Sequence, residues 1–245
     1  MDGASLSDAI TIFRLWFLAD SFYSFNGLEC IQFGDLRYLR ENMERRGRER
    51  NTSVMNGMHR TGYGISDLVA DIRVITADAE DEREIIGQVC DLAAWLSRNT
   101  EGWLHSSGFV CDREQGFSRN LLHEEPDRSL AVYAVTWWPG GGTPPHDHST
   151  WEVVAPVIGA SRHVTWMRSD DRSVPGCASI ERSCDFLVRP GEAVSVTSSG
   201  IHNVVNEGGD MGLSLHIYGR TERPLEPTRF DPETHREDRF MLRVG

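Results

Sequence analysis

The sequence lacks any paired-cysteine motif. Its five cysteines are odd in number and form no CxxC pair. This pattern fits a reducing compartment better than a disulfide framework, so we expect a cytoplasmic protein. The cysteines are Cys30, Cys90, Cys111, Cys177 and Cys184.

Positive charge is scarce, because 25 Lys and Arg residues stand against 37 Asp and Glu. The formal net charge is −12 and the sequence pI is near 5.2. Nucleic acids and anionic membranes bind basic surfaces, so neither is an expected partner. The one basic run, Arg37–Arg50, is interleaved with Glu41, Glu44 and Glu49. We interpret it as a solvated helix rather than a binding patch.

Long apolar runs are also missing. The most apolar early segment, Ala9–Leu18, is too short to cross a bilayer, and no convincing leader-cleavage site follows it. Neither export nor a membrane anchor is expected.

The 245 residues suit one domain with an appendage. No internal repeat or low-complexity tract is present. We expect an N-terminal extension (1–62, helical or partly disordered), a helical lead-in (63–106), a β-barrel (107–222) and a C-terminal tail (223–245).

Within the extension, Ile10, Phe13 and Phe17 fall at helical spacing. This spacing predicts a short amphipathic helix that either docks on the main body or forms a homodimer contact. The purpose of the extension stays open.

Two helices are predicted ahead of the strands. Leu68, Val69, Ile72 and Ile75 form one apolar stripe, and a second runs from Ile85 to Leu96. Beyond residue 107 the apolar period shortens to that of strands. The predicted strands are Ala131–Trp138, Trp151–Ile158, His163–Met167, Asp185–Val188, Ala193–Thr197, Val204–Val205 and Gly212–Tyr218. Short strands between Gly, Pro and Asp turns predict an all-β barrel or double-sheet jelly roll.

Three histidines have the spacing of metal ligands. His146 and His148 lie two residues apart, so on an extended chain both imidazoles point to one face. His202 follows downstream, and imidazole is the commonest protein ligand of first-row transition metals. The sequence therefore predicts one metal site built from these three side chains.

The flanking spacings resemble the two motifs of the cupin superfamily. Gly140 precedes His146 by six positions, Glu152 follows His148 by four, and Gly159 closes the motif. Gly191 and the pair His202 and Asn206 resemble the second motif. The resemblance implies an all-β core, a cupin jelly-roll barrel, preceded by an α-helical N-terminal region.

The segment GLSLHIYG narrows the resemblance. Ser214, His216 and Tyr218 alternate along one predicted strand and so share a face. With the histidine motif they resemble the cysteine dioxygenase-like thiol dioxygenases, over roughly residues 66–219. That family implies Fe(II) held by three histidines, here His146, His148 and His202. It also implies that Ser214, His216 and Tyr218 act as a hydrogen-bonded catalytic relay.

Arg119 bears on the substrate. Its segment GFSRNLLH resembles the family's Tyr-x-Arg-Asn-Leu segment, in which the arginine binds the substrate carboxylate. A guanidinium matches a carboxylate bidentately. Relatives that act on 3-mercaptopropionate usually have glutamine there, so Arg119 favours L-cysteine. Taken alone, Arg119 could equally be an exposed ion-pairing residue.

Glu152 departs from the thiol dioxygenase pattern. It has the same parity as His146 and His148, which makes it a candidate fourth ligand, as in germins or acireductone dioxygenases. Such a site could also accept Ni(II) or Mn(II) in place of Fe(II). The alternative is that Glu152 pairs with Arg119 or another interior cation without touching the metal.

Other residues carry no expected chemistry. No cysteine lies between His146 and Gly176, where animal relatives place a thiol that cross-links to the relay tyrosine, so Tyr218 should be unmodified. The tryptophans around the motif, Trp137, Trp138, Trp151 and Trp166, are interpreted as barrel packing. Four further histidines, His105, His123, His163 and His235, match no ligand spacing.

The resemblance implies an enzyme that takes a small thiol and dioxygen and forms a sulfinic acid, with L-cysteine as the expected substrate. Three alternatives remain: a biosynthetic cysteine oxygenase that uses Glu152 to form a rearranged or decarboxylated product, a 3-mercaptopropionate-type thiol dioxygenase, and a non-catalytic ligand-binding or germin-like cupin. An acireductone or flavonol dioxygenase would give Arg119 no role.

Overall fold

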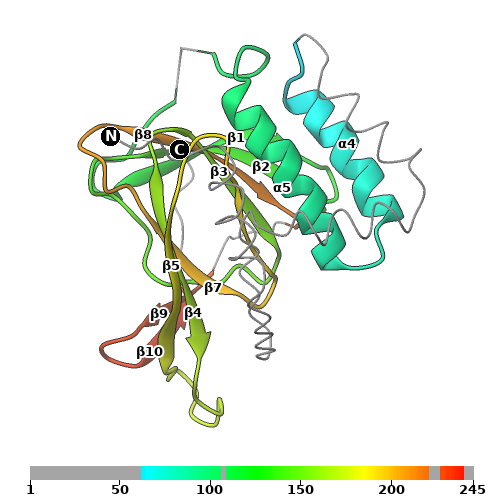
Figure 1. Cartoon of the computed structure of the whole chain (residues 1–245). Helices are drawn as coiled ribbons and strands as arrows, with labels where there is room; N and C mark the ends of the chain where they lie inside the picture. Colours follow the sequence, from blue (N-terminus) through cyan, green and yellow to red (C-terminus); the bar gives the residue numbers. More distant parts are fainter. Residues whose placement is uncertain (1–61, 106–108, 221–226, 240–245) are drawn as a thin grey trace, which may run out of the picture.

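The computed structural model describes residues 62–105, 109–220 and 227–239. Over these residues two helices are followed by ten strands (Figure 1). The amphipathic helix and homodimer contact predicted near Phe13 lie outside the described residues, as does the basic run Arg37–Arg50.

Helix α4 (Ile65–Asp78) begins where the sequence gives it a cap. The Asp67 carboxylate accepts the backbone N–H of Gly64 at 3.0 Å. This bond satisfies one of the amides that a helix start leaves unpaired. The predicted apolar stripe, from Leu68 to Ile75, is the buried face.

Helix α5 (Glu82–Arg98) is capped by Asp81, whose carboxylate accepts the Glu84 N–H at 2.9 Å. Its buried face includes Val89 and Leu92 and packs on strands β3, β6 and β8. In Figure 1 the two helices lie side by side and cover one side of the strands.

Eight strands form two antiparallel sheets that face each other. The larger has the order β1 (Phe117–Glu124), β2 (Ala131–Trp137), β8 (Gly212–Tyr218), β3 (Glu152–Ile158) and β6 (Val194–Val196). The smaller has the order β5 (Ile180–Val188), β4 (Ser161–Arg168) and β7 (Ile201–Val205). This arrangement confirms the predicted all-β, double-sheet barrel preceded by helices.

Strand β8 explains why the barrel interior is polar. Leu213, Leu215 and Ile217 join the apolar cluster beneath the helices, on the outer face of the larger sheet. The alternate residues, Ser214 to Tyr218, point to the opposite face and into the barrel. Every residue of β8 is buried, so the polar side chains of the inner face have to find partners inside.

Some strand boundaries differ from the sequence prediction. β8 is as predicted, but β7 begins at Ile201 and therefore includes His202, and β5 begins at Ile180. Strand β1, which carries Arg119, was not predicted as a strand. It pairs with β2 across a register shift between Leu121 and His123, and this irregularity obscures its alternation.

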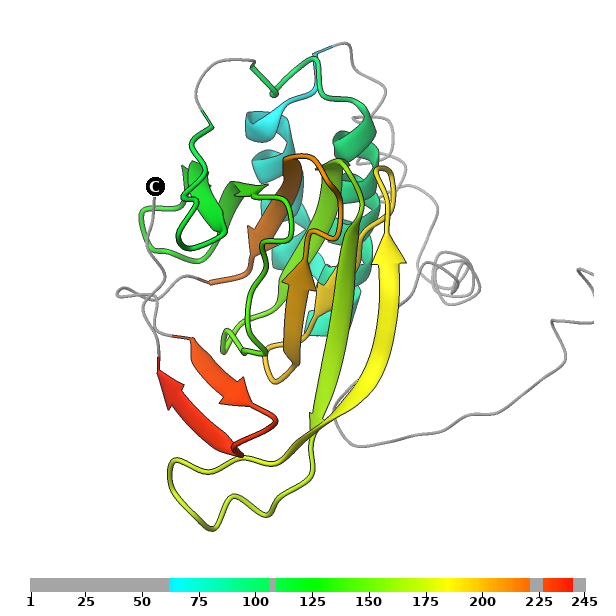
Figure 2. The same ribbon diagram turned by 90° about the vertical axis from the view of Figure 1, so that its left-hand side faces the viewer.

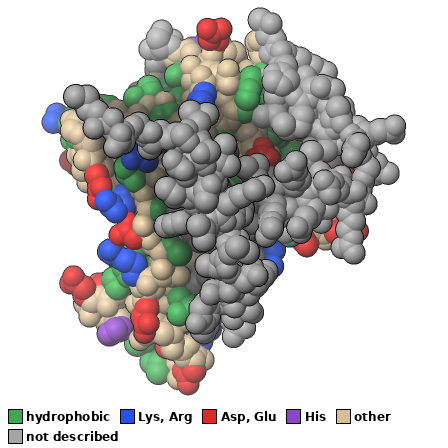
Figure 3. All heavy atoms as spheres, viewed as in Figure 1, with side chains coloured by type: hydrophobic (Ala, Val, Ile, Leu, Met, Phe, Trp, Pro, Cys, Tyr) green, Lys and Arg blue, Asp and Glu red, His purple; other side chains and the backbone are tan. Residues whose placement is uncertain are grey.

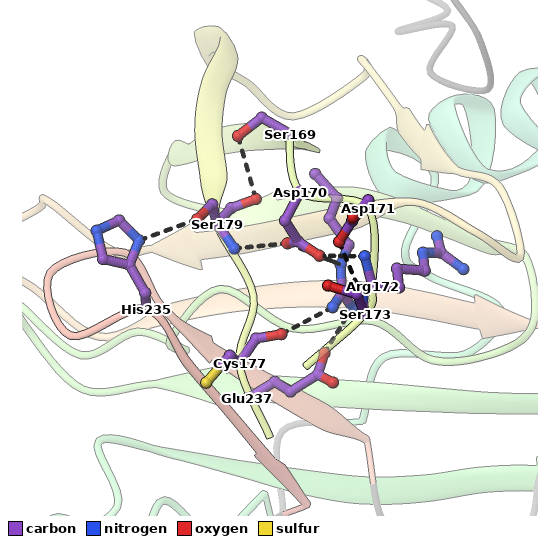
Figure 4. A network of polar contacts seen from close by, with 10 residues as sticks. Ser169, Asp170, Asp171, Arg172, Ser173, Cys177, Ser179, His235 and Glu237 are labelled. Atoms are coloured by element: carbon purple, nitrogen blue, oxygen red, sulfur yellow. Dashed lines mark hydrogen bonds and ion pairs between the residues drawn. The ribbon is translucent and has the colours of Figure 1, made fainter. Parts of the chain in front are cut away.

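The segment expected as a C-terminal tail contains a hairpin, β9 (Thr228–Asp231) and β10 (Arg236–Arg239). Figure 2 shows it beside the loop that joins β4 to β5. Arg168 at the end of β4 binds Glu237 of β10 at 2.5 Å. Figure 4 shows the polar network around this contact, in which Asp170 accepts the Ser179 N–H at 2.6 Å. Buried Phe230 packs beneath the hairpin against Ile201 and Ala178.

In the view of Figure 3, basic and acidic side chains lie next to one another and form no patch of one sign. Arg162 illustrates this, since it pairs with Asp185 at 2.7 Å and with Glu207 at 2.6 Å. Among the described residues, neither helix has the length and apolarity needed to span a membrane.

Candidate metal centre

The HDH motif lies on the loop before β3, and two neighbours hold it. His146 and His202 exchange both backbone hydrogen bonds, at 2.8 and 2.9 Å, so the motif is paired to β7. On the other side, Phe230 of β9 donates its N–H to the Pro145 carbonyl at 2.8 Å. Ser149 adopts a left-handed φ of 55° and turns the chain from His148 towards β3.

The three predicted imidazoles meet inside the barrel. One ring nitrogen from each of His146, His148 and His202 lies within 4.8 Å of the other two. His146 places Nδ1 2.8 Å from the Pro144 carbonyl, which leaves Nε2 to face the cluster. Nε2 of His148 and Nε2 of His202 are 3.1 Å apart. The prediction that these histidines form one cluster is confirmed.

Burial keeps two of the three imidazoles uncharged. It lowers the pKa of His148 and holds the pKa of His146 well below its usual range, and in His146 the neighbouring imidazoles lower it further. Neutral imidazoles are the form that binds a metal ion. The two side chains are therefore ready to act as ligands near neutral pH.

Glu152 lies against the cluster. It occupies the first position of β3 and is 1% exposed. Its Oε2 is 3.1 Å from Nε2 of His148 and 3.0 Å from Nε2 of His202. Two ligands at right angles on an ion, each bonded at about 2.1 Å, stand about 3 Å apart. The donor set and its spacing therefore fit a divalent first-row metal.

The charge of Glu152 follows from the same contacts. Burial alone would raise the pKa of this carboxyl, but the imidazoles of His148 and His202 outweigh burial and hold the pKa well below its usual range. Glu152 is therefore a carboxylate. The Arg119 guanidinium makes no hydrogen bond to this carboxylate, so the alternative pairing with Arg119 is not present in the structure.

The second oxygen of Glu152 reaches the predicted relay. Oε1 lies 2.7 Å from Nδ1 of His216, and Nε2 of that ring lies 2.8 Å from the Ser214 hydroxyl. Trp137 Nε1 donates to the same hydroxyl at 2.7 Å. The relay thus continues into the metal cluster through Glu152, which the sequence did not predict.

Tyr218 contacts the relay more loosely, with its hydroxyl 3.4 Å from His216 Nδ1. Burial raises the pKa of Tyr218 well above its usual value, and the negative charge of Glu152 adds to the effect. The phenol therefore keeps its proton. Its ring stands edge-on to the His148 ring, with centroids 5.1 Å apart.

Arg119 points from β1 into the same interior. It is 3% exposed, and its guanidinium lies over the Tyr133 ring at 4.2 Å and the Tyr218 ring at 5.1 Å. None of its three side-chain nitrogens has a hydrogen-bond partner in the part of the chain that the structure describes. The interpretation of Arg119 as an exposed ion-pairing residue is therefore wrong.

Two aromatic residues of this interior were not expected to contribute. Tyr133 and Trp137 belong to β2, directly beside β8, and share its inward face. The register that pairs Tyr133 with His216 could not be read from the sequence. The sequence signal was that both residues occupy alternate positions of one apolar strand and therefore share a face. Ordinary barrel packing gives the same pattern.

The other described histidines that match no ligand spacing lie outside the cluster. His105 and His235 are exposed, and His123 lies 3.3 Å from Glu125. His163 is 1% exposed inside the barrel, where its Nε2 lies 2.9 Å from the Ser161 hydroxyl. None of these four belongs to the metal-ligand cluster found among the described residues.

A cavity of about 390 Å³ lies between the β4–β5 loop and the β9–β10 hairpin. Its lining includes Asp147, Arg172 and Phe230 but none of the three clustered imidazoles. We therefore place the candidate chemistry in the barrel interior and not in this cavity.

No protein-family model matches the chain. Among solved structures, an oxalate oxidase in complex with glycolate matches with 18% identity and a TM-score of 0.37, over 47% of this chain and 56% of that chain. A DMSP lyase from Ruegeria pomeroyi matches with 20% identity and a TM-score of 0.36, over 52% and 58%. An RmlC-like cupin from Desulfovibrio desulfuricans matches with 18% identity and a TM-score of 0.34, over 47% and 95%.

The chain thus spans little more than half the length of the oxidase and the lyase. Matches at these identities and scores say nothing about the activity of this chain. The two-sheet barrel with its inward histidines is what confirms the predicted cupin-type jelly roll.

The metal cluster predicts a simple loss of binding. His202→Gln should reduce bound divalent metal to below a tenth of the wild-type content, because it removes one of three imidazole ligands. His235→Gln changes an exposed histidine and serves as the matched control. Metal content after gel filtration, measured by mass spectrometry, compares the two. Equal metal retention in both variants would contradict the site.

His163 predicts a pH dependence of stability. The pKa of His163 is lowered from 6.5 to about 3. Burial is the largest cause, and the nearby imidazoles of His202 and His216 add to it. As the pH falls through this window, the unfolded chain takes up a proton that the folded chain does not. The free energy of unfolding therefore decreases with falling pH.

In His163→Gln that contribution disappears. Between pH 6 and 4 the slope of unfolding free energy against pH should be smaller than in the wild type by about 1.4 kcal/mol per pH unit, the value for one proton. Urea unfolding of metal-free protein at several pH values measures it. Identical slopes would show that His163 titrates normally in the folded protein.

Proposed function

We propose that this protein is a metal-dependent cupin oxygenase that oxidises the sulfur of L-cysteine with dioxygen to a sulfinic acid. The observation that carries the proposal is Arg119. A buried guanidinium without a hydrogen-bond partner, in the same interior as three imidazoles, calls for an anionic ligand. Its likeness to the carboxylate-binding arginine of thiol dioxygenases points the same way.

The energetics favour a carboxylate at Arg119. A buried charge with no partner is costly, and the two tyrosine rings offset only part of that cost. A carboxylate can accept two parallel hydrogen bonds from the guanidinium and neutralise its charge. A small thiol anchored in this way would hold its sulfur within the barrel, near the imidazole cluster.

His146, His148 and His202 would hold the metal, for which we propose Fe(II), while Ni(II) or Mn(II) would also suit imidazole and carboxylate donors. Bound there, the ion would supply the redox chemistry that joins dioxygen to sulfur. The reaction balances without a further reductant: the thiol and one dioxygen molecule give the sulfinic acid. Sulfur is oxidised, and both oxygen atoms are reduced and retained in the product.

Within this proposal, the chain's own residues orient the substrate and position protons. Tyr218 retains its proton near the cluster and can donate a hydrogen bond where negative charge develops. Ser214 and His216 fix the neighbouring carboxylate. Tyr133 and Tyr218 pack on Arg119 and keep its guanidinium in the interior.

Oxygen consumption tests the proposal. Iron-loaded protein should take up dioxygen with L-cysteine and form the sulfinate, identified by mass. Arg119→Gln should lower kcat/KM for cysteine about 100-fold, because the bidentate, charge-assisted contact is lost. The same substitution should not change kcat/KM for cysteamine, which has no carboxylate.

Arg113→Gln is the control, since Arg113 lies over Trp138 and takes no part in the cluster. 3-Mercaptopropionate, which has the carboxylate but no amine, tests the alternative substrate. Absence of uptake with all three thiols would contradict the proposal. Tight cysteine binding without uptake would point instead to a non-catalytic binding barrel.

A second candidate follows from the position of Glu152. If its carboxylate occupies a metal position, the site becomes three histidines and one carboxylate, and one position for substrate or dioxygen closes. The protein would then be a biosynthetic cysteine oxygenase whose product is rearranged or decarboxylated.

Glu152→Ala separates the two candidates. Under the second, the product mass should change from the wild-type compound to plain sulfinate, because a metal position opens. Metal content is measured in parallel. Equal oxygen uptake and equal sulfinate yield in wild type and variant would eliminate the second candidate.

A further inference from the structure

The hydrogen-bond chain from Trp137 to Glu152 has a fixed direction. The indole N–H of Trp137 can only donate, and it donates to the Ser214 hydroxyl. At the other end, the Glu152 carboxylate can only accept, and its Oε1 lies 2.7 Å from His216 Nδ1. The acceptor end determines which nitrogen of His216 carries the hydrogen, and the donor at the other end is compatible with the same order.

A neutral His216 ring has one N–H. That hydrogen must lie on Nδ1, because Nδ1 otherwise turns a lone pair to a carboxylate oxygen in a buried site. Nε2 is then an acceptor, and the Ser214 hydroxyl, which already accepts from Trp137, has its own hydrogen to donate at 2.8 Å. The bond from Trp137 is compatible with this order, because the hydroxyl accepts with one lone pair and keeps its hydrogen to donate.

We propose that Trp137 and Ser214 are positioning residues that fix this order and thereby hold Glu152 as a metal-facing carboxylate. The Nδ1–H of His216 occupies Oε1, so Oε2 is the oxygen left to face His148 and His202. Ordered partners behind a metal ligand set its orientation and its basicity. The inference rests on the metal site of the proposed function and not on its substrate.

One consequence concerns Tyr218. Because the single N–H of His216 is directed to Glu152, His216 offers the phenol no acceptor at Nδ1. The phenol hydrogen is then available to Glu152 or to a molecule bound beside the cluster. His216 acts on Glu152, and Tyr218 acts independently of the ring.

The barrel contains a matched comparison on the opposite sheet. Ser161 and His163 repeat the Ser-x-His arrangement on β4, with the hydroxyl 2.9 Å from Nε2. The Nδ1 of His163 has no partner among the residues described, so this pair ends without a carboxylate. Ser161→Ala thus removes the same kind of bond with no link to Glu152.

The first test determines which ring nitrogen of His216 carries the proton. Full-length protein loaded with Zn²⁺, which is diamagnetic, is labelled with ¹⁵N-histidine, and His216 is assigned by its loss in His216→Gln. Long-range ¹H–¹⁵N spectra should show a protonated Nδ1 and an unprotonated Nε2. The opposite tautomer would overturn the proposal.

The second test measures Co²⁺ affinity by competition with a chelator. Ser214→Ala should weaken binding about 10-fold, as expected when a metal ligand loses its supporting partner, and Trp137→Phe should weaken it in the same direction. Ser214→Thr, which keeps the hydroxyl, should restore it, and Ser161→Ala should have no effect. Neither test requires thiol or dioxygen, so both can be interpreted even if the protein has no oxygenase activity. Equal affinity in Ser214→Ala and Ser161→Ala would overturn the positioning role.

Discussion

Glu152 is a carboxylate with 1% exposure, and this burial constrains everything around it. A carboxylate removed from water loses several kcal/mol of hydration unless cations and hydrogen-bond donors replace the solvent. Here His216 supplies a donor to one oxygen, while His148 and His202 face the other. A metal ion on those imidazoles would supply the missing positive charge.

The fold tolerates this polar interior because the two faces of the same strands have different roles. On β8 the outward residues pack under the helices, and the inward residues carry hydroxyl, imidazole and phenol groups. Antiparallel pairing then sets Tyr218 beside Glu152 on β3 and His216 beside Tyr133 on β2. The outer face contributes the apolar burial, so the inner face is free to specialise in chemistry.

Spacing and resemblance predicted the three clustered histidines because the HxH signal is local and the spacing of His202 matched a known motif. Local pattern also predicted the helices and most strands. It could not predict that Glu152 contacts His216, since this depends on the register between β3 and β8, some 64 positions apart in sequence. The involvement of Trp137 depends on a similar long-range pairing. Arg119 was assigned by resemblance, while its burial between two tyrosines depends on an irregular strand whose alternation is broken.

The central claim is that Glu152 faces the metal with Oε2 while His216 holds Oε1. A crystal structure of the iron-loaded protein, grown without oxygen, measures both contacts in one experiment. We expect the ion on the three imidazole nitrogens, with Oε2 turned towards it and Oε1 still hydrogen-bonded to His216; an Oε2–metal distance of about 2.0–2.2 Å would mark Glu152 as a fourth ligand. A carboxylate turned away from the ion, towards Arg119, would contradict this arrangement.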